Sequence, residues 1–178
     1  MLLILQSFAD IALLRRGPQS LPASTVLLCF AVLGVGALSL LPIPGQTLTL
    51  TERVVIYVLY AAMTLSVIGL LLNSMGRSER FVQTATAMFG ADLILTCMKL
   101  FVVFLFPDTL ELFEQNRRYS GGLLLRIALE AWSLCVMSSI LRAAMSISVL
   151  QSFGIIVLIM MLYFGAAGLV LRALMTGT

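Results

Sequence analysis

The sequence predicts an all-α integral membrane protein in which an N-terminal interfacial amphipathic helix precedes five transmembrane helices. Hydrophobic residues make up 61% of the 178 residues and charged residues only 11%, whereas soluble domains carry about 25% charged residues. Apolar segments long enough to cross a bilayer recur along the chain. No linker rich in proline, serine or charge divides them, so we expect residues 1–178 to form a single helical bundle.

The N-terminal segment, residues 1–16, is apolar but too short to span a membrane. Its positive charges follow the apolar stretch, which is the reverse of their order in a cleaved signal peptide. One side of its helical wheel is apolar and holds Ile4, Leu5, Phe8, Ile11 and Ala12. We expect an interfacial helix that ends at Gly17-Pro18, with Arg15 and Arg16 among the lipid headgroups. A helix buried in the bundle is the alternative.

Five segments are predicted to cross the membrane. They are residues 21–41, 53–73, 81–106, 123–147 and 149–174. Ser20 suits the N-cap of the first crossing, because Pro22 then falls in the first turn. Tyr57 and Tyr60 lie near the start of the second, where aromatic side chains commonly anchor at headgroup level. Between the third and fourth, residues 107–122 suggest a short surface helix.

The third and fourth crossings contain ionisable side chains. Such a residue costs roughly 2.5 to 3.5 kcal/mol at a helix centre, so it usually faces the bundle interior and has a partner. Asp92 and Lys99 are two helical turns apart and therefore share one face. From the rise per residue, Lys99 and Glu130 lie at similar depth on antiparallel helices, so we predict an ion pair. Arg126, one turn from Glu130, is a second candidate partner.

Asp92 falls near the middle of the third crossing, without a base at equal depth. We expect it to be protonated, bonded to a hydroxyl such as that of Thr64 or Ser66, or reached by water. The intramembrane polar residues can serve helix packing, a proton or ion pathway, or the docking of a partner.

The last crossing carries a strip of small residues, in which Gly165 and Gly168 flank two alanines. Small residues let helices approach closely in lipid. We expect this strip to bind another membrane protein or a second copy of the chain. Packing against the first transmembrane helix is the alternative.

The sequence gives no sign of a metal or cofactor site. Cys29, Cys97 and Cys135 lie in different apolar segments, without metal-ligand spacing, and histidine is absent. We therefore predict buried, unpaired thiols and no cofactor. The basic residues mostly lie at segment ends rather than in one run, so nucleic-acid binding is not expected.

Arginines in the short loops set the predicted orientation, which has the N-terminus in the cytoplasm and the C-terminus outside. This orientation places on the cytoplasmic side Arg15, Arg16, Arg77, Arg80 and Arg142. It places outside, or near the outer boundary, Arg53, Arg117, Arg118, Arg126 and Arg172. The first loops usually dominate, and there Arg15 and Arg16 outweigh Arg53.

Two stretches resemble bacterial members of the Yip1-like group of five-helix membrane proteins. The first is residues 16–24, which lead into the five crossings. The second is residues 129–142, which hold Trp132 and include the start of Leu141-Arg142-Ala143. The resemblance implies a non-enzymatic role in membrane organisation, in the cell inner membrane. The chain lacks the long polar N-terminal region of the eukaryotic relatives, so the resemblance carries over no GTPase partner.

Three function classes follow. We favour a non-enzymatic scaffold or assembly subunit that binds membrane lipids, a membrane partner or both. The alternative is a small transporter or channel subunit that uses Asp92, Lys99 and Glu130, although we detect no inverted repeat of the kind common in transporters. A lipid-processing enzyme would need a base and a nucleophile near one interface, and Glu114, Tyr119 and Ser120 match no known spacing.

Overall fold

The computed structural model describes residues 2–43, 48–106 and 121–176, and these residues form helices joined by short connections. In chain order the helices are α1 (Leu2–Ala12), the 3₁₀ turn η1 (Pro18–Ser20), α2 (Thr25–Ser39), α3 (Leu50–Ser74), the 3₁₀ turn η2 (Ser78–Arg80), α4 (Phe81–Leu105), α6 (Gly121–Met145) and α7 (Val149–Thr176). Four of them, α3, α4 together with η2, α6 and α7, are long and apolar enough to cross a membrane. The prediction of an all-helical protein is thereby confirmed for the described residues.

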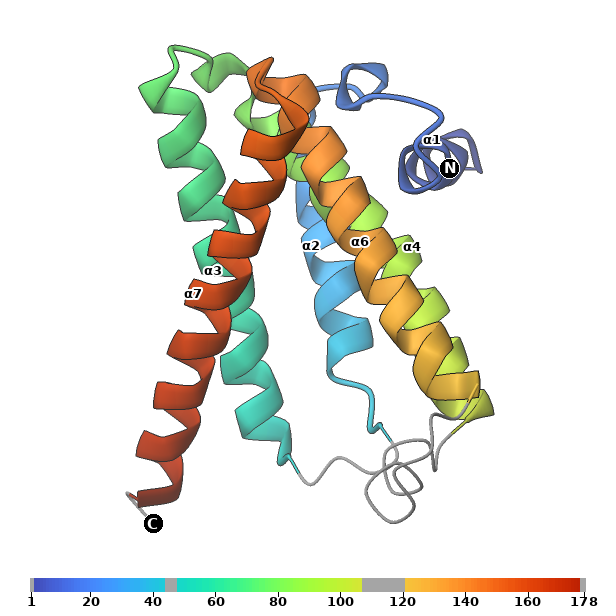
Figure 1. Cartoon of the computed structure of the whole chain (residues 1–178), viewed down its shortest axis with the longest axis vertical. Coiled ribbons are helices and arrows are strands. Elements are labelled where there is room, and N and C mark those ends of the chain that lie inside the picture. Colours follow the sequence, from blue (N-terminus) through green and yellow to red (C-terminus); the bar gives the residue numbers. More distant parts are fainter. Residues whose placement is uncertain (1, 44–47, 107–120, 177–178) are drawn as a thin grey trace.

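Helices α2, α3, α4, α6 and α7 form two groups that diverge along the bundle (Figure 1). In this view α2, α4 and α6 lie together and α3 and α7 lie together, although α6 also contacts α7. The groups are closest at the end that holds the α3–α4 and α6–α7 connections, and they separate toward the C-terminal end. Helix α1 lies at the closed end and packs against α4 and α6, whereas α7 ends at the open end.

Helix α4 is the centre of the bundle, since it contacts α1, α2, α3 and α6. Eight consecutive residues near its start, 84–91, are buried, and most of them are small. Small side chains let neighbouring helices approach α4 from several directions. At Gly90 the approach is closest, because a Cβ atom there would overlap the ring of Phe8. The core therefore lies around the first half of α4.

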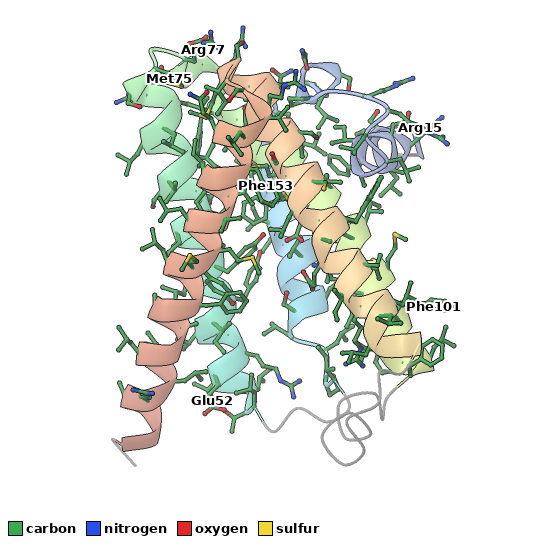
Figure 2. The ribbon with its side chains drawn as sticks, viewed as in Figure 1. Arg15, Glu52, Met75, Arg77, Phe101 and Phe153 are labelled. Atoms are coloured by element: carbon green, nitrogen blue, oxygen red, sulfur yellow. The ribbon has the colours of Figure 1, made fainter. Side chains whose placement is uncertain are left out.

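The outward-facing side chains are largely apolar (Figure 2). The large apolar residues with the greatest exposure lie on α2, α3 and α7, and they are Leu33, Leu70, Leu150 and Leu169. A soluble fold would bury such residues, whereas lipid solvates them. The apolar outer surface agrees with the membrane class predicted from composition.

The first predicted crossing is shorter than expected. Residues 21–41 were predicted to be helical, but α2 comprises only the 15 residues Thr25–Ser39. Ser20 does not cap it, because its hydroxyl donates to the carbonyl of Gly17 at 2.9 Å. Ser24 is the N-cap instead and accepts from the backbone N–H of Leu27. The carbonyl of Leu21 is also held outside the helix, by a bond from Gln83 Nε2 at 2.7 Å.

Two other helix ends also differ from the prediction. Helix α3 begins at Leu50 rather than residue 53, since Thr49 and Glu52 form a capping box. Helix α1 ends at Ala12 rather than at Gly17-Pro18. Leu14 there has φ 59°, and the N–H of Arg15 bonds to the carbonyl of Asp10 across the turn.

The cysteine prediction is wrong about burial. Cys29, Cys97 and Cys135 are free thiols, but all three are exposed on the outside of the bundle. These helices are apolar on every side, so hydrophobicity does not reveal which face is buried. The predicted surface helix at 107–122 falls mainly outside the described residues, as do Glu114, Arg117, Arg118, Tyr119 and Ser120.

Replacing Gly90 with alanine should destabilise the protein, because the added methyl group overlaps Phe8 and must displace α1. Overpacking of a core typically costs about 1–3 kcal/mol. Thermal unfolding in detergent should show a lower midpoint for Gly90→Ala than for the wild type. The matched control is Gly154→Ala on α7, where a Cβ atom would meet no described atom within 4 Å. If both variants unfold like the wild type, α1 does not pack on α4 in this way.

Candidate functional site

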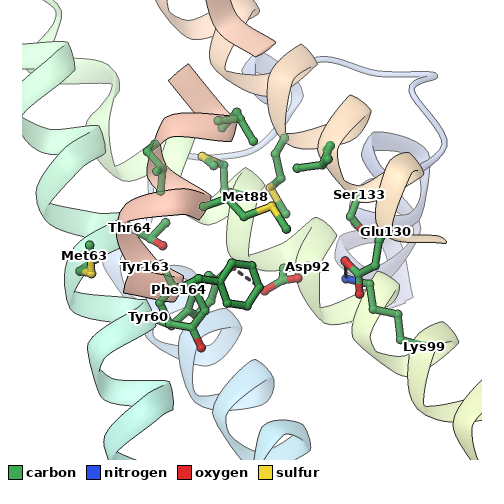
Figure 3. Close-up of a pocket in the computed structure, with 15 residues that line it drawn as sticks. Tyr60, Met63, Thr64, Met88, Asp92, Lys99, Glu130, Ser133, Tyr163 and Phe164 are labelled. Atoms are coloured by element: carbon green, nitrogen blue, oxygen red, sulfur yellow. Dashed lines mark hydrogen bonds and ion pairs between the residues drawn. The ribbon is translucent and has the colours of Figure 1, made fainter. Parts of the chain in front are cut away.

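A cavity of about 280 Å³ lies where the two helix groups separate. Side chains from α3, α4, α6 and α7 line it (Figure 3). Its charged side chains are Asp92, Lys99 and Glu130. A second cavity of about 340 Å³ adjoins it and is lined also by the end of α2 and the start of α3. The two cavities share Tyr60, Lys99, Glu130 and Tyr163, so the polar residues lie between them.

Asp92 bonds to a hydroxyl that the sequence did not identify. The hydroxyl of Tyr60 on α3 donates to Asp92 Oδ2 at 2.8 Å, whereas Thr64 and Ser66 were the predicted donors. The ring of Tyr60 is held edge-on against Phe89 and Tyr163, at centroid distances of 6.0 and 5.6 Å. Asp92 is therefore tied to α3 through an immobilised phenol, which satisfies part of its hydrogen-bonding capacity.

The hydroxyls of the two tyrosines of α3 bond to neighbouring helices. Tyr57 donates its hydroxyl to the carbonyl of Val32 on α2. Gly36 makes room for this ring, since a Cβ atom there would lie 2.6 Å from Tyr57 Cε1. Both phenols thus face other helices, because the bundle offers an acceptor to each.

Lys99 and Glu130 form the ion pair that the depth comparison predicted. Lys99 Nζ lies 2.9 Å from Glu130 Oε2, and the pair joins α4 to α6. The side chains retain 26% and 56% of their accessible surface, respectively. The exposed parts of the two side chains line both cavities between the helix groups.

Arg126 is not a second partner of Glu130. Its Nη2 donates instead to the carbonyl of Phe106 at 3.2 Å, near the end of α4. Its Nε is buried and has no hydrogen-bond partner among the residues that the structure describes. An i, i+4 spacing permits a contact on one helix but does not decide it, and here a carbonyl of the neighbouring helix competes successfully.

The remaining candidate residues lie away from the cavities. Arg15 and Arg16 are exposed beside α1, where Arg16 pairs with Asp10 at 3.2 Å. Gly165 and Gly168 lie on an open face of α7, because a Cβ atom at either would meet no described atom within 4 Å. Their packing against the first transmembrane helix, the alternative considered from the sequence, is thus ruled out for the described residues.

Sequence reasoning missed the aromatic and sulfur side chains that complete the cavity. Tyr163 and Phe164 line it from α7, and Met63, Met88 and Met160 contribute from three helices. Tyr163 lies well inside an apolar segment rather than at its end, and the position of its phenol could have indicated the cavity from the sequence. The methionines gave no such signal, because methionine is common in any apolar helix.

Comparison of this chain with protein families, with curated proteins and with solved structures finds no match. The site is therefore interpreted from its own geometry. It can hold one or more polar groups within an apolar surround, and among the described residues no three or more aspartate, glutamate or cysteine side chains are grouped as metal ligands.

Lys99→Met and Glu130→Gln should each lower the unfolding temperature in detergent, and the double variant should recover much of the loss. Removing one partner of a buried pair costs about 3–5 kcal/mol, and we expect less here because Glu130 is half exposed. A coupling of about 0.5–3 kcal/mol between the two sites is the range for residues in contact. Losses that simply add would mean that the contact does not stabilise the fold.

Proposed function

We propose that this chain is a non-enzymatic multi-pass protein of the cell inner membrane that acts as a scaffold or assembly subunit, binding lipids, a membrane partner or both. The observation that carries the proposal is the open apolar face of α7. Among the four long helices, α7 has the smallest share of buried residues. Its exposed side chains include Met161 and Leu169, and Gly165 and Gly168 lie on the same helix without a neighbour in the described residues.

This face suits a helix better than it suits lipid alone. Gly165 and Gly168 are three residues apart, so they lie near each other on the helix surface. In lipid, helices associate through dispersion and close backbone approach rather than through hydrophobic burial. A partner helix, from another membrane protein or a second copy, would fill the shallow surface that the two glycines leave. The same role is the one implied by the resemblance to the Yip1-like group.

The proposed topology has five crossings, with α2 as the shortest. Fifteen helical residues rise about 22 Å at 1.5 Å each, against a hydrocarbon thickness of about 30 Å. The non-helical residues 21–24 before α2 and 40–43 after it would make up the rest of the span. The positions of α1 and the end of α7 at opposite ends of the bundle support an odd number of crossings (Figure 1).

Helix α1 is proposed to lie at the cytoplasmic interface. Its Phe8, Ile11 and Ala12 are buried, while Arg15 projects outward beside it (Figure 2). Arg77 lies at the same end of the bundle, so the basic residues of the α3–α4 connection share a side with those that follow α1. This grouping supports the orientation with the N-terminus in the cytoplasm and the C-terminus outside.

The second candidate is a small transporter or channel subunit. The adjoining cavities favour it, because they place Asp92, Lys99 and Glu130 along one space between the helix groups. Intramembrane ionisable residues beside a cavity are typical of ion and substrate pathways.

Reporter fusions test the topology. Reporters placed at Gly17 and at Thr178 should give opposite sidedness, and a reporter at Gly76 should agree with the one at Gly17. Equal sidedness for Gly17 and Thr178 would contradict five crossings, because only an even number returns the chain to its starting side.

Co-purification in mild detergent tests the partner surface. The wild type should elute as a complex, either with another membrane protein or with itself, and Gly168→Leu should release the partner while the chain stays folded. The matched control is Gly121→Leu at the start of α6, another glycine without a described neighbour within 4 Å. A lone wild-type monomer, or a complex that Gly168→Leu leaves intact, would count against a scaffold that works through α7.

A further inference from the structure

We propose that the cavity between α3, α4, α6 and α7 binds an organic cation with an apolar body, such as a lipophilic ammonium or phosphonium ion. Two carboxylates, Asp92 and Glu130, lie in this cavity together with three aromatic rings, Tyr60, Tyr163 and Phe164. This inference goes beyond the scaffold role, which needs no small ligand.

The charges of the cavity favour a cation. Its two carboxylates and one ammonium sum to one negative charge when all three are ionised. Lys99 is already committed to Glu130 at 2.9 Å, and Asp92 has a neutral hydroxyl, that of Tyr60, as its bonded partner. An uncompensated charge within a membrane is costly. A bound cation would neutralise it, whereas a bound anion would double it.

The aromatic rings of the cavity also attract a cation. Tyr60 and Tyr163 meet edge to face with centroids 5.6 Å apart, and the ring of Phe164 lies 5.3 Å from that of Tyr163. Aromatic faces carry negative potential and attract organic cations within about 6 Å. Rings that are fixed against one another require little reordering when a ligand binds.

The rest of the wall suits an apolar ligand body. Aliphatic side chains from α6 and α7 face the cavity, and so do methionines from α3, α4 and α7. Methionine adapts its shape to different ligands. The volume of about 280 Å³ is close to the lower end of the range of small-molecule sites. The adjoining cavity of about 340 Å³ is lined also by Arg53, so a cation fits the first cavity better than the second. The ligand would thus place its charge at Asp92 and its apolar part against α6 and α7.

Tetraphenylphosphonium is a direct probe, because tetraphenylborate has the same shape and the opposite charge. We would reconstitute the full chain in nanodiscs of phosphatidylcholine and measure both probes by equilibrium dialysis, with empty nanodiscs as the background. The proposal expects saturable binding of the phosphonium above background and no saturable binding of the borate. Equal binding of the two ions would overturn it, since the cavity would then select only for apolar surface.

Variants on α4 and α6 that change the net charge of the cavity test whether it prefers a positively charged ligand. Asp92→Asn and Glu130→Gln each remove the excess negative charge and should weaken phosphonium binding about tenfold or more. Lys99→Met increases the excess and should tighten binding, while Lys99→Met combined with Glu130→Gln restores the original sum and should bind nearly as the wild type does. The matched control is Glu79→Gln in η2, outside the cavity, which should change nothing.

Size-exclusion profiles would confirm that each variant is folded, and if Asp92→Asn fails to fold the three other cavity variants still decide the question. Affinities that are unchanged across them would overturn the proposal. That result would mean that a proton on a carboxyl, rather than an organic cation, removes the excess charge. No binding of the phosphonium to the wild type would overturn it as well.

Discussion

Close packing around the first half of α4 is the constraint on which the rest of the structure depends. Lipid offers no hydrophobic drive for helix association, so helices must gain contacts by approaching closely. The buried residues 84–91 are mostly small, and they let α1, α2, α3 and α6 all contact one helix. The ring of Phe8 fits over Gly90, and Leu93 packs against Gly34 of α2. A Cβ atom at Gly90 would overlap the ring of Phe8, so a side chain there would displace α1.

Polar bonds hold the same end of the bundle closed. Arg77 and Arg80 donate to the carbonyl of Ala144 in the last turn of α6, at 3.3 and 3.2 Å, and Arg77 also reaches the hydroxyl of Ser146 at 2.8 Å. Trp132 donates to the carbonyl of Ala12 at 2.9 Å, which ties α1 to α6. These arginines satisfy orphan helix carbonyls with charged donors, one of the stronger kinds of hydrogen bond.

Beyond this closed end the helix groups separate, and the polar residues of the membrane interior are found there. An unsatisfied polar group in lipid costs several kcal/mol. Tyr60 with Asp92, and Lys99 with Glu130, meet this requirement by bonding across helices. The Tyr60–Asp92 bond joins the two helix groups, and residues of both pairs line the two cavities in this region. The polar pairs and the cavities therefore lie in the same region, where the two helix groups diverge.

The sequence by itself determined the helical membrane class, the long apolar helices and the pairing of Lys99 with Glu130. The class and the helices depend on composition and segment length, and the pairing follows from the rise per residue once consecutive helices are taken as antiparallel neighbours. The partner of Asp92 depended on how α3 is rotated about its axis, and a helix that is apolar all round carries no periodic signal for that rotation. The same reason explains why the exposed cysteines were expected to be buried. The late start of α2 is accompanied by a contact that no local rule reveals, since the carbonyl of Leu21 accepts from the side chain of Gln83, 62 residues away, while Ser24 caps the helix.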